Sequence, residues 1–96
     1  MSRPEKRTVV VFAAAWRVLP WLPGADREDE WVTAAAVAEH VHELHGAHAA
    51  RDVPGLLSVL RRAGFAVDRE DPAGVKHWRR TPKGTTALIT HQETHP

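Results

Sequence analysis

The sequence predicts a small α+β domain in which three helices are followed by a two- to three-stranded β-hairpin. Apolar residues recur at helical spacing in three segments before Gly64. After Gly64 the period changes to the alternation of a strand, and the turn sequence Asp71-Pro-Ala-Gly74 separates two such strands. The order of these patterns therefore assigns helices to the first part of the chain and a hairpin to the second.

Length and composition limit the class of protein. The 96 residues suffice for one domain, and hydrophobic and charged fractions of 43% and 26% are typical of a globular chain. There is no cysteine, which excludes disulfides, thiol nucleophiles and cysteine-based zinc sites. The apolar run 9–16 is much shorter than the roughly 20 residues of a membrane span, so we expect a cytoplasmic protein.

The first part of the chain is expected to contain one apolar helix. We expect residues 1–7 to form a flexible basic arm, residues 8–90 the domain and residues 91–96 a frayed tail. The first helix is predicted from Thr8, a suitable N-cap, to Pro20. It is apolar nearly all round, which predicts burial on more than one side. An acidic loop, 26–30, and a short strand, Trp31-Val32, are expected to follow.

Two further helices are predicted from their end signals. The second helix begins after its N-cap Thr33 and ends near His45, before Gly46. Residues 46–51 are expected to form a connector, and Asp52 is the expected N-cap of the third helix. The residues predicted to form the buried stripe of this third helix are Leu56, Leu60 and Ala63.

The remainder of the chain is expected to form the hairpin and one last short element. Residues 65–70 and 75–81 have the alternation of two strands. Thr81-Pro-Lys-Gly84 begins a final turn or short helix. Its apolar side is expected to consist of Ala87, Leu88 and Ile89.

Three segments of the chain resemble bacterial winged helix-turn-helix regulators of the MarR and PadR kind. They are Thr33-Ala-Ala-Ala-Val-Ala38, Leu56-Leu-Ser-Val-Leu-Arg-Arg-Ala-Gly-Phe65 and Trp78-Arg-Arg-Thr-Pro-Lys-Gly84. The resemblance spans roughly residues 31–88. It implies that the third helix reads double-stranded DNA, that the second helix supports the third, and that the hairpin forms a wing. The chain departs from the family pattern in the longer stretch around 46–51 and in Arg80, where an apolar residue is usual.

Basic residues are concentrated in the half of the chain that is expected to face DNA. Residues 51–96 carry eight Lys or Arg and five Asp or Glu, whereas residues 1–50 carry five and seven. Ser58 and Arg62 lie opposite the buried stripe on a helical wheel, and such side chains read base edges in the major groove. The candidate DNA-binding residues are Arg51, Pro54, Gly55, Ser58, Arg61, Arg62, Lys76, Arg79, Arg80 and Lys83. Trp78, which lies among them, is expected to pack in the core rather than stack on bases.

The apolar first helix also predicts self-association. A three-helix domain covers one stripe of such a helix, and the remainder would be an exposed apolar patch. We therefore expect a homodimer whose interface contains Phe12, Trp16, Leu19 and Trp21. The alternative is that residues 87–89 fold back over the patch within one chain.

Four of the seven histidines lie close together, at His40, His42, His45 and His48. They do not form an H-E-x-x-H motif, so a solvated helix face is the expected role, with metal sensing and a pH-tuned contact as alternatives. No metal or cofactor is predicted. The glycines are isolated rather than grouped in a nucleotide-binding loop, and Ser58 has no assigned base, so we expect no enzymatic activity.

The function predicted from the sequence is sequence-specific binding of double-stranded DNA by a small transcriptional regulator. One alternative is a winged-helix protein-interaction module that contacts a protein partner through the acidic loop 26–30. A second is an architectural, excisionase-like DNA accessory protein. No membrane partner is expected.

Overall fold

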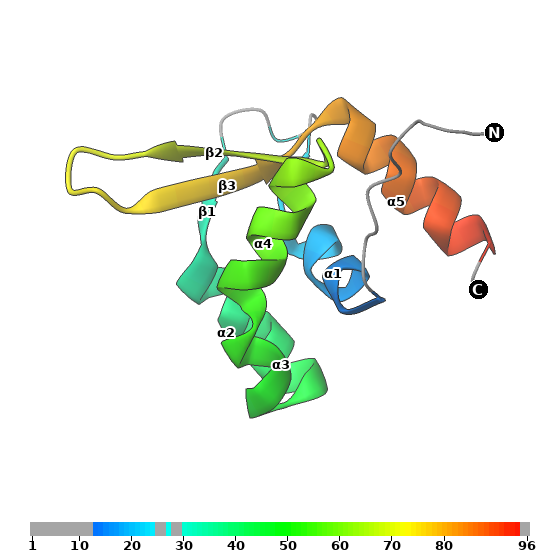
Figure 1. Ribbon diagram of the computed structural model, residues 1–96, viewed down its shortest axis with the longest axis horizontal. Coiled ribbons are helices and arrows are strands. Elements are labelled where there is room, and N and C mark those ends of the chain that lie inside the picture. Colours follow the sequence, from blue (N-terminus) through cyan, green and yellow to red (C-terminus); the bar gives the residue numbers. More distant parts are fainter. Residues whose placement is uncertain (1–12, 25–26, 28–29, 95–96) are drawn as a thin grey trace, which may run out of the picture.

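The α+β class is confirmed by a computed structural model that describes residues 13–24, 27 and 30–94. In this part of the chain the helices are α1 (Ala13–Val18), α2 (Ala34–His45), α3 (Ala47–Arg51), α4 (Val53–Arg62) and α5 (Pro82–Thr94), with a 3-10 turn η1 (Leu19–Trp21) after α1. The strands are β1 (Val32–Thr33), β2 (Ala66–Glu70) and β3 (Lys76–Arg80). Figure 1 shows the β2–β3 hairpin extending from one side of the helices and α5 projecting on the other.

The three strands form one antiparallel sheet in the order β1-β3-β2. Trp78 lies at its centre, paired with Val32 of β1 and with Asp68 of β2. The Trp78 side chain is only 4% exposed, which confirms that it packs in the core. In β2 the buried residue is Ala66, and its neighbour Val67 is exposed on the opposite face. One face of the hairpin therefore packs toward the helices.

Helices α1, α2 and α4 enclose the core. The buried stripe of α4 consists of Val53, Leu57 and Leu60, at spacings of i, i+4 and i+7. The prediction that placed Leu56 in this stripe is wrong, because Leu56 is half-buried on the flank of α4 that faces α1. Leu60 and Ala63 are buried as expected.

The ends of α2 follow their local sequence signals. Thr33 Oγ1 accepts a hydrogen bond from the Ala36 N–H at 3.1 Å, as an N-cap does. Gly46 ends the helix at a φ of 92°, a backbone conformation that favours glycine. The predicted connector instead contains the short helix α3. Asp52 occupies the N-cap position of α4 as predicted, but its backbone is helical and its side chain makes no cap hydrogen bond.

The hairpin turn is organised by the side chain of Asp71. Its Oδ1 accepts hydrogen bonds from the N–H groups of Ala73 (2.9 Å) and Val75 (3.0 Å), and its Oδ2 lies 2.9 Å from His77 Nε2. The hydrogen bond with His77, followed by that from Val75, lowers the pKa of Asp71. The folded-state pKa is thus depressed, so the carboxylate stabilises the turn above its ordinary pKa and loses this effect only as the pH falls through the lowered value.

The C-terminal element is a longer helix than expected. Helix α5 continues to Thr94, so residues 91–94 are helical where a frayed tail was predicted, and residues 95–96 lie outside the described part. The predicted arm 1–7, the cap Thr8 and Phe12 also lie outside it. Strand β1 likewise differs by one residue from the predicted Trp31-Val32. No helix in the described ranges is long and apolar enough to cross a membrane.

Candidate nucleic-acid interface

The surface of α4 that faces away from the core carries a row of three residues, Gly55, Ser58 and Arg62. They lie opposite the buried stripe, and Gly55 and Arg62 are exposed. Ser58 is half-buried and its hydroxyl donates to the Pro54 carbonyl at 3.4 Å. Arg62 makes no hydrogen bond or ion pair with any residue that the structure describes. This row, which we call the α4 outer row, therefore presents one available guanidinium beside two small residues.

Gly55 leaves open space above the backbone of α4. Its φ is not positive, and a Cβ atom built on it would have no neighbour within 4 Å. Neither the backbone conformation nor internal packing therefore requires a glycine here. An exposed glycine inside a helix is unfavourable by about 1 kcal/mol relative to alanine, so its presence favours a role in which another molecule approaches the backbone closely.

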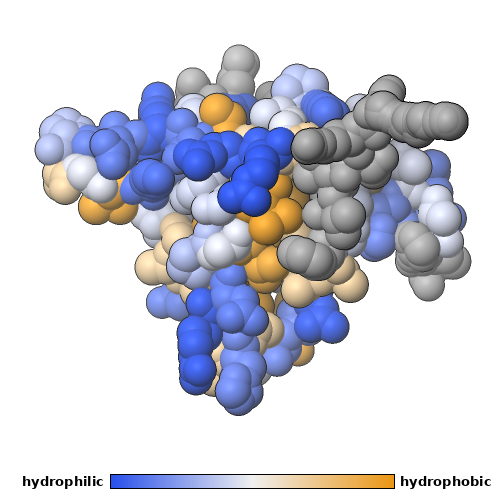
Figure 2. All heavy atoms as spheres, viewed as in Figure 1, coloured by the Kyte–Doolittle hydropathy of each residue, from blue (hydrophilic) through white to orange (hydrophobic). Residues whose placement is uncertain are grey.

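An ion cluster joins α4 to the hairpin beside this row. Arg61 Nη1 lies 3.2 Å from Oδ2 and 3.4 Å from Oδ1 of Asp68, and Lys76 Nζ lies 3.8 Å from the same Oδ2. The Asp68 side chain is 15% exposed, whereas those of Arg61 and Lys76 are each 49% exposed. Two of the predicted DNA-binding cations thus share one carboxylate and are still accessible to solvent. Figure 2 shows that hydrophilic side chains gather along the hairpin on this side of the molecule.

Arg80 has a structural position that the sequence did not predict. Its Nη1 donates to the carbonyls of Leu22 (2.9 Å) and Leu19 (3.4 Å), and its Nε donates to Thr85 Oγ1 (3.0 Å). Its Nη2 lies so near Gly24 that a Cβ atom there would be 2.6 Å away. Arg80 therefore holds η1 and the following segment against β3 and α5, and its guanidinium is engaged within the chain rather than in the candidate interface.

Arg79 also binds within the chain. Its Nη2 donates to the Gly24 carbonyl at 2.9 Å, and its guanidinium lies 5.5 Å from the ring centroid of Trp31. Arg69 lies closer to the same ring, at 4.3 Å. This Arg–Trp–Arg contact connects residues distant in sequence, and the sequence analysis did not identify Arg69. Arg79 is half-buried like Arg80, so its position does not favour contact with a phosphate.

The remaining predicted residues lie at the ends of elements. Arg51 is exposed at the end of α3, and Pro54 is exposed in the first turn of α4. Lys83 is exposed in the first turn of α5, with Nζ 5.8 Å from the ring centroid of Phe65. Arg51 and Pro54 therefore border one end of the α4 outer row, whereas Lys83 belongs to a different element.

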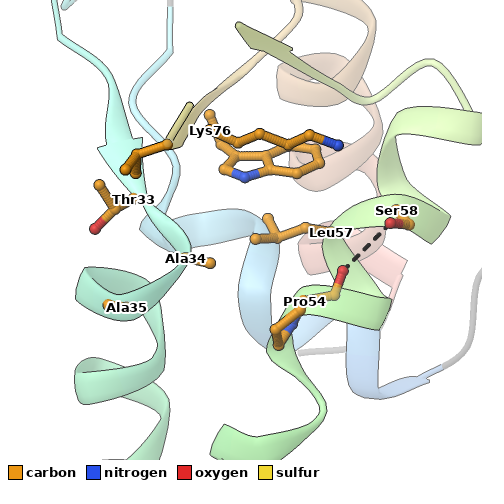
Figure 3. A pocket seen from close by; sticks show the side chains of 9 residues that line it. Thr33, Ala34, Ala35, Pro54, Leu57, Ser58 and Lys76 are labelled. Atoms are coloured by element: carbon orange, nitrogen blue, oxygen red, sulfur yellow. Dashed lines mark hydrogen bonds between the residues drawn. The ribbon is translucent and has the colours of Figure 1, made fainter. Parts of the chain in front are cut away.

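A pocket of about 320 Å³ separates the start of α2 from α4 and β3. Figure 3 shows Ala34 and Leu57 on its walls, with Thr33, Ser58 and Lys76 supplying the polar groups. The dashed line in the figure is the hydrogen bond from Ser58 to Pro54. Ser58 therefore belongs both to the α4 outer row and to this pocket.

The residues predicted for a dimer interface are largely occupied within the chain. Leu19 is 0% exposed, so the prediction that it lies in an interface is wrong. Trp16 stacks on His91 of α5 with ring centroids 4.1 Å apart, and Trp21 stacks on His40 at 4.3 Å. The C-terminal helix thus folds back over Trp16, which was the alternative explanation for the apolar first helix, although the stacking residue is His91 rather than one of residues 87–89.

The histidine cluster does not converge on one point. All four histidines are exposed on α2 and α3, and His40 also stacks on Trp21. His45 and His48 line a pocket of about 270 Å³ together with Arg17 and Asp52. Among the described residues, no group of three or more His, Cys, Asp or Glu side chains is placed to hold a metal ion.

Comparisons with known proteins do not narrow the function further. No protein-family model, curated protein or solved structure matched this chain significantly. The function is therefore inferred from the arrangement of the described residues.

Proposed function

We propose that this chain is a winged-helix domain that binds double-stranded DNA and regulates transcription, with α4 as the recognition helix and the β2–β3 hairpin as the wing. The order α1, β1, α2, α4, β2, β3 and the strand order β1-β3-β2 are compatible with this fold. The observation that carries the proposal is the α4 outer row, in which Arg62 has no partner in the described part of the chain and Gly55 leaves the backbone approachable.

In this proposal the α4 outer row enters the major groove. Arg62 has the forked donors that recognise guanine, and the Ser58 hydroxyl can donate to or accept from a base edge. Arg51 at the preceding helix end and Lys76 on the wing contact phosphates on either side. Phosphate contacts fix the register on the duplex, and the base contacts supply the preference for sequence.

We expect binding to be salt-dependent and its preference to depend on Arg62. Each phosphate contact contributes about −0.9 to the slope of log K against log salt, so roughly two to four contacts per protomer predict a slope of about −2 to −4. Arg62→Gln should weaken binding to a preferred duplex by about 1–3 kcal/mol and reduce discrimination among sequences. Fluorescence anisotropy with duplexes selected from a random pool measures both effects.

Arg17→Gln is the matched control for this experiment, because Arg17 is an exposed arginine on α1 and belongs to a different surface. It removes the same formal charge and should leave the preference among sequences unchanged. Failure of the wild-type protein to bind any duplex at about 50 mM salt would contradict the proposed function.

Gly55→Ala should separate stability from binding. The helical backbone and the open space predict that alanine stabilises the fold by about 0.5–1 kcal/mol. The added methyl group would enter the gap between α4 and the base edges, so we expect DNA affinity to fall severalfold. Urea unfolding and anisotropy titration of the same preparation test the pair of effects. A stabilised protein with unchanged DNA affinity would show that α4 does not approach DNA through this residue.

A protein-interaction module is the second candidate function. It is favoured by the intramolecular bonds of Arg61, Arg79 and Arg80, which reduce the number of cations available to phosphate. In that case the salt slope would be near zero for duplex DNA. An architectural role would instead retain the slope and show no sequence preference in either the wild type or Arg62→Gln.

We propose that the chain forms a homodimer through α1 and α5. The surface there contains the half-buried Trp16 and a pocket of about 370 Å³ that Ala87 and His91 line beside it. Ala87→Glu should then convert a dimer at micromolar concentration into a folded monomer, because it places a charge beside Trp16 in an apolar interface. Sedimentation equilibrium measures the mass, and a wild type that is monomeric throughout would contradict the dimer.

A further inference from the structure

We propose that Asp68 sets the DNA affinity of this domain by competing with DNA phosphate for Arg61 and Lys76. The inference rests on the proposed DNA-binding function and assigns a role to an acidic residue within that surface. In the free protein the carboxylate occupies the two cations. On DNA, a phosphate takes its place on one or both of them.

The geometry places both cations on one carboxylate oxygen. Arg61 Nη1 and Lys76 Nζ lie 3.2 and 3.8 Å from Asp68 Oδ2. The cations come from different elements, since Arg61 is in the last turn of α4 and Lys76 is the first residue of β3. Asp68 therefore lies at the junction between the proposed recognition helix and the wing, where a DNA backbone would have to pass.

The Asp68 carboxylate is less exposed to solvent than the two cations that it contacts. Asp68 is 15% exposed, and each cation is 49% exposed. The outer N–H groups of Arg61 and Lys76 can therefore meet a phosphate, while the anion lies behind them. Carboxylate and phosphate are alternative partners for the same guanidinium donors, so the contact with Asp68 opposes each phosphate contact that these cations make.

The effect should be independent of DNA sequence. Asp68 is a carboxylate facing cations that would bind backbone, and it is separate from the α4 outer row that would read bases. It should lower affinity for all duplexes by the same factor and leave the salt slope, which counts the phosphate contacts of the complex, nearly unchanged. This behaviour differs from that expected of Arg62, whose loss changes the preference among sequences.

Glu70→Gln provides a matched control for Asp68→Asn. Glu70 is on the same strand and pairs with Lys76 in the ladder, but it makes no ion pair with any described residue. Both substitutions remove one negative charge from the hairpin. A difference between them therefore reports the contacts of Asp68 rather than net charge.

We expect Asp68→Asn to bind every duplex about fivefold more tightly than Glu70→Gln at low salt, since an opposite charge at about 4 Å is worth roughly 1 kcal/mol in water. Its salt slope should stay close to that of the wild type, because the same cations contact phosphate in both complexes. In an Arg61→Gln background the gain should shrink, because Lys76 alone remains. Thermal unfolding confirms that each variant is folded, and Asp68→Ser is a second neutral variant that should give the same gain.

The outcomes separate this inference from the function on which it rests. Wild-type protein that binds DNA, with Asp68→Asn no tighter than Glu70→Gln, would overturn the role of Asp68 and leave the DNA-binding function intact. A full gain in the Arg61→Gln background would overturn the exchange through Arg61. A wild type that binds no duplex would overturn both proposals.

Discussion

Gly84→Ala should destabilise the fold by about 3 kcal/mol or more, at the upper end of the cost of overpacking a core. A Cβ atom on Gly84 would overlap the carbonyl oxygen of Phe65 and lie 2.9 and 3.0 Å from its carbonyl carbon and Cα. All three atoms belong to the backbone, so a change of rotamer cannot relieve the overlap. The start of α5 would have to move away from the end of α4.

Hydrogen bonds oppose such a movement. Thr81 Oγ1 donates to the Gly64 carbonyl at 2.6 Å and accepts from the Gly84 N–H at 2.9 Å. The Thr81 N–H donates to the Phe65 carbonyl, and the Phe65 N–H donates to the Leu60 carbonyl. The close contact of Gly84 is therefore held by bonds on both sides of it, and displacement of α5 would break several of them.

Urea unfolding followed by tryptophan fluorescence measures the loss, and for a domain of this size each kcal/mol corresponds to about 4–8 °C in melting temperature. Thr86→Ala is the control, because Thr86 lies two residues further along α5 and is exposed. It should leave the free energy of unfolding nearly unchanged. A Gly84→Ala protein with wild-type stability would show that the α4–α5 junction is looser than described.

The features predicted correctly from the sequence depend on residues a few positions apart. The Thr33 cap bonds a residue three positions away, and the Asp71 turn bonds residues two and four positions away. Gly46 and Gly64 have the positive φ angles expected at helix ends. These signals are sufficient to order the helices and the hairpin, because each is decided by local backbone geometry.

The failures involve partners that are distant in the chain or elements that lack a distinct period. Helix α3 contains only five residues, too few for an apolar stripe to show in the sequence. Arg79 and Arg80 were assigned to DNA because the run of cations in the hairpin favoured phosphate contact. Their actual acceptors lie 55 to 61 residues earlier in the chain, and no spacing rule identifies such pairs.

The candidate site was predicted only where local helical periodicity determines the position of its residues. The outward position of Ser58 and Arg62 follows from helical periodicity, and the structure places both away from the core. The Asp68 contacts depend on how the hairpin crosses α4, so the sequence did not reveal that Arg61 and Lys76 share an anion. The structure therefore divides the predicted cations into two groups. Arg79 and Arg80 are half-buried and bonded within the chain, whereas the others are exposed, and the sequence did not distinguish the two groups.

Arg80→Leu should cost about 2–4 kcal/mol of folding free energy, because charge-assisted hydrogen bonds contribute about 1.5–3 kcal/mol each and their loss leaves carbonyl groups without donors. The guanidinium donates to the carbonyls of Leu19 and Leu22 and to the hydroxyl of Thr85. Leucine would leave these acceptors without their donor.

The DNA-binding behaviour of the same variant decides whether Arg80 also contacts phosphate. Below its unfolding temperature, Arg80→Leu should retain the wild-type salt slope, whereas Arg62→Gln should alter the preference among sequences. An Arg80→Leu protein as stable as the wild type, with a slope flatter by about 0.9, would show that Arg80 binds DNA and that its bonds to η1 are dispensable for folding.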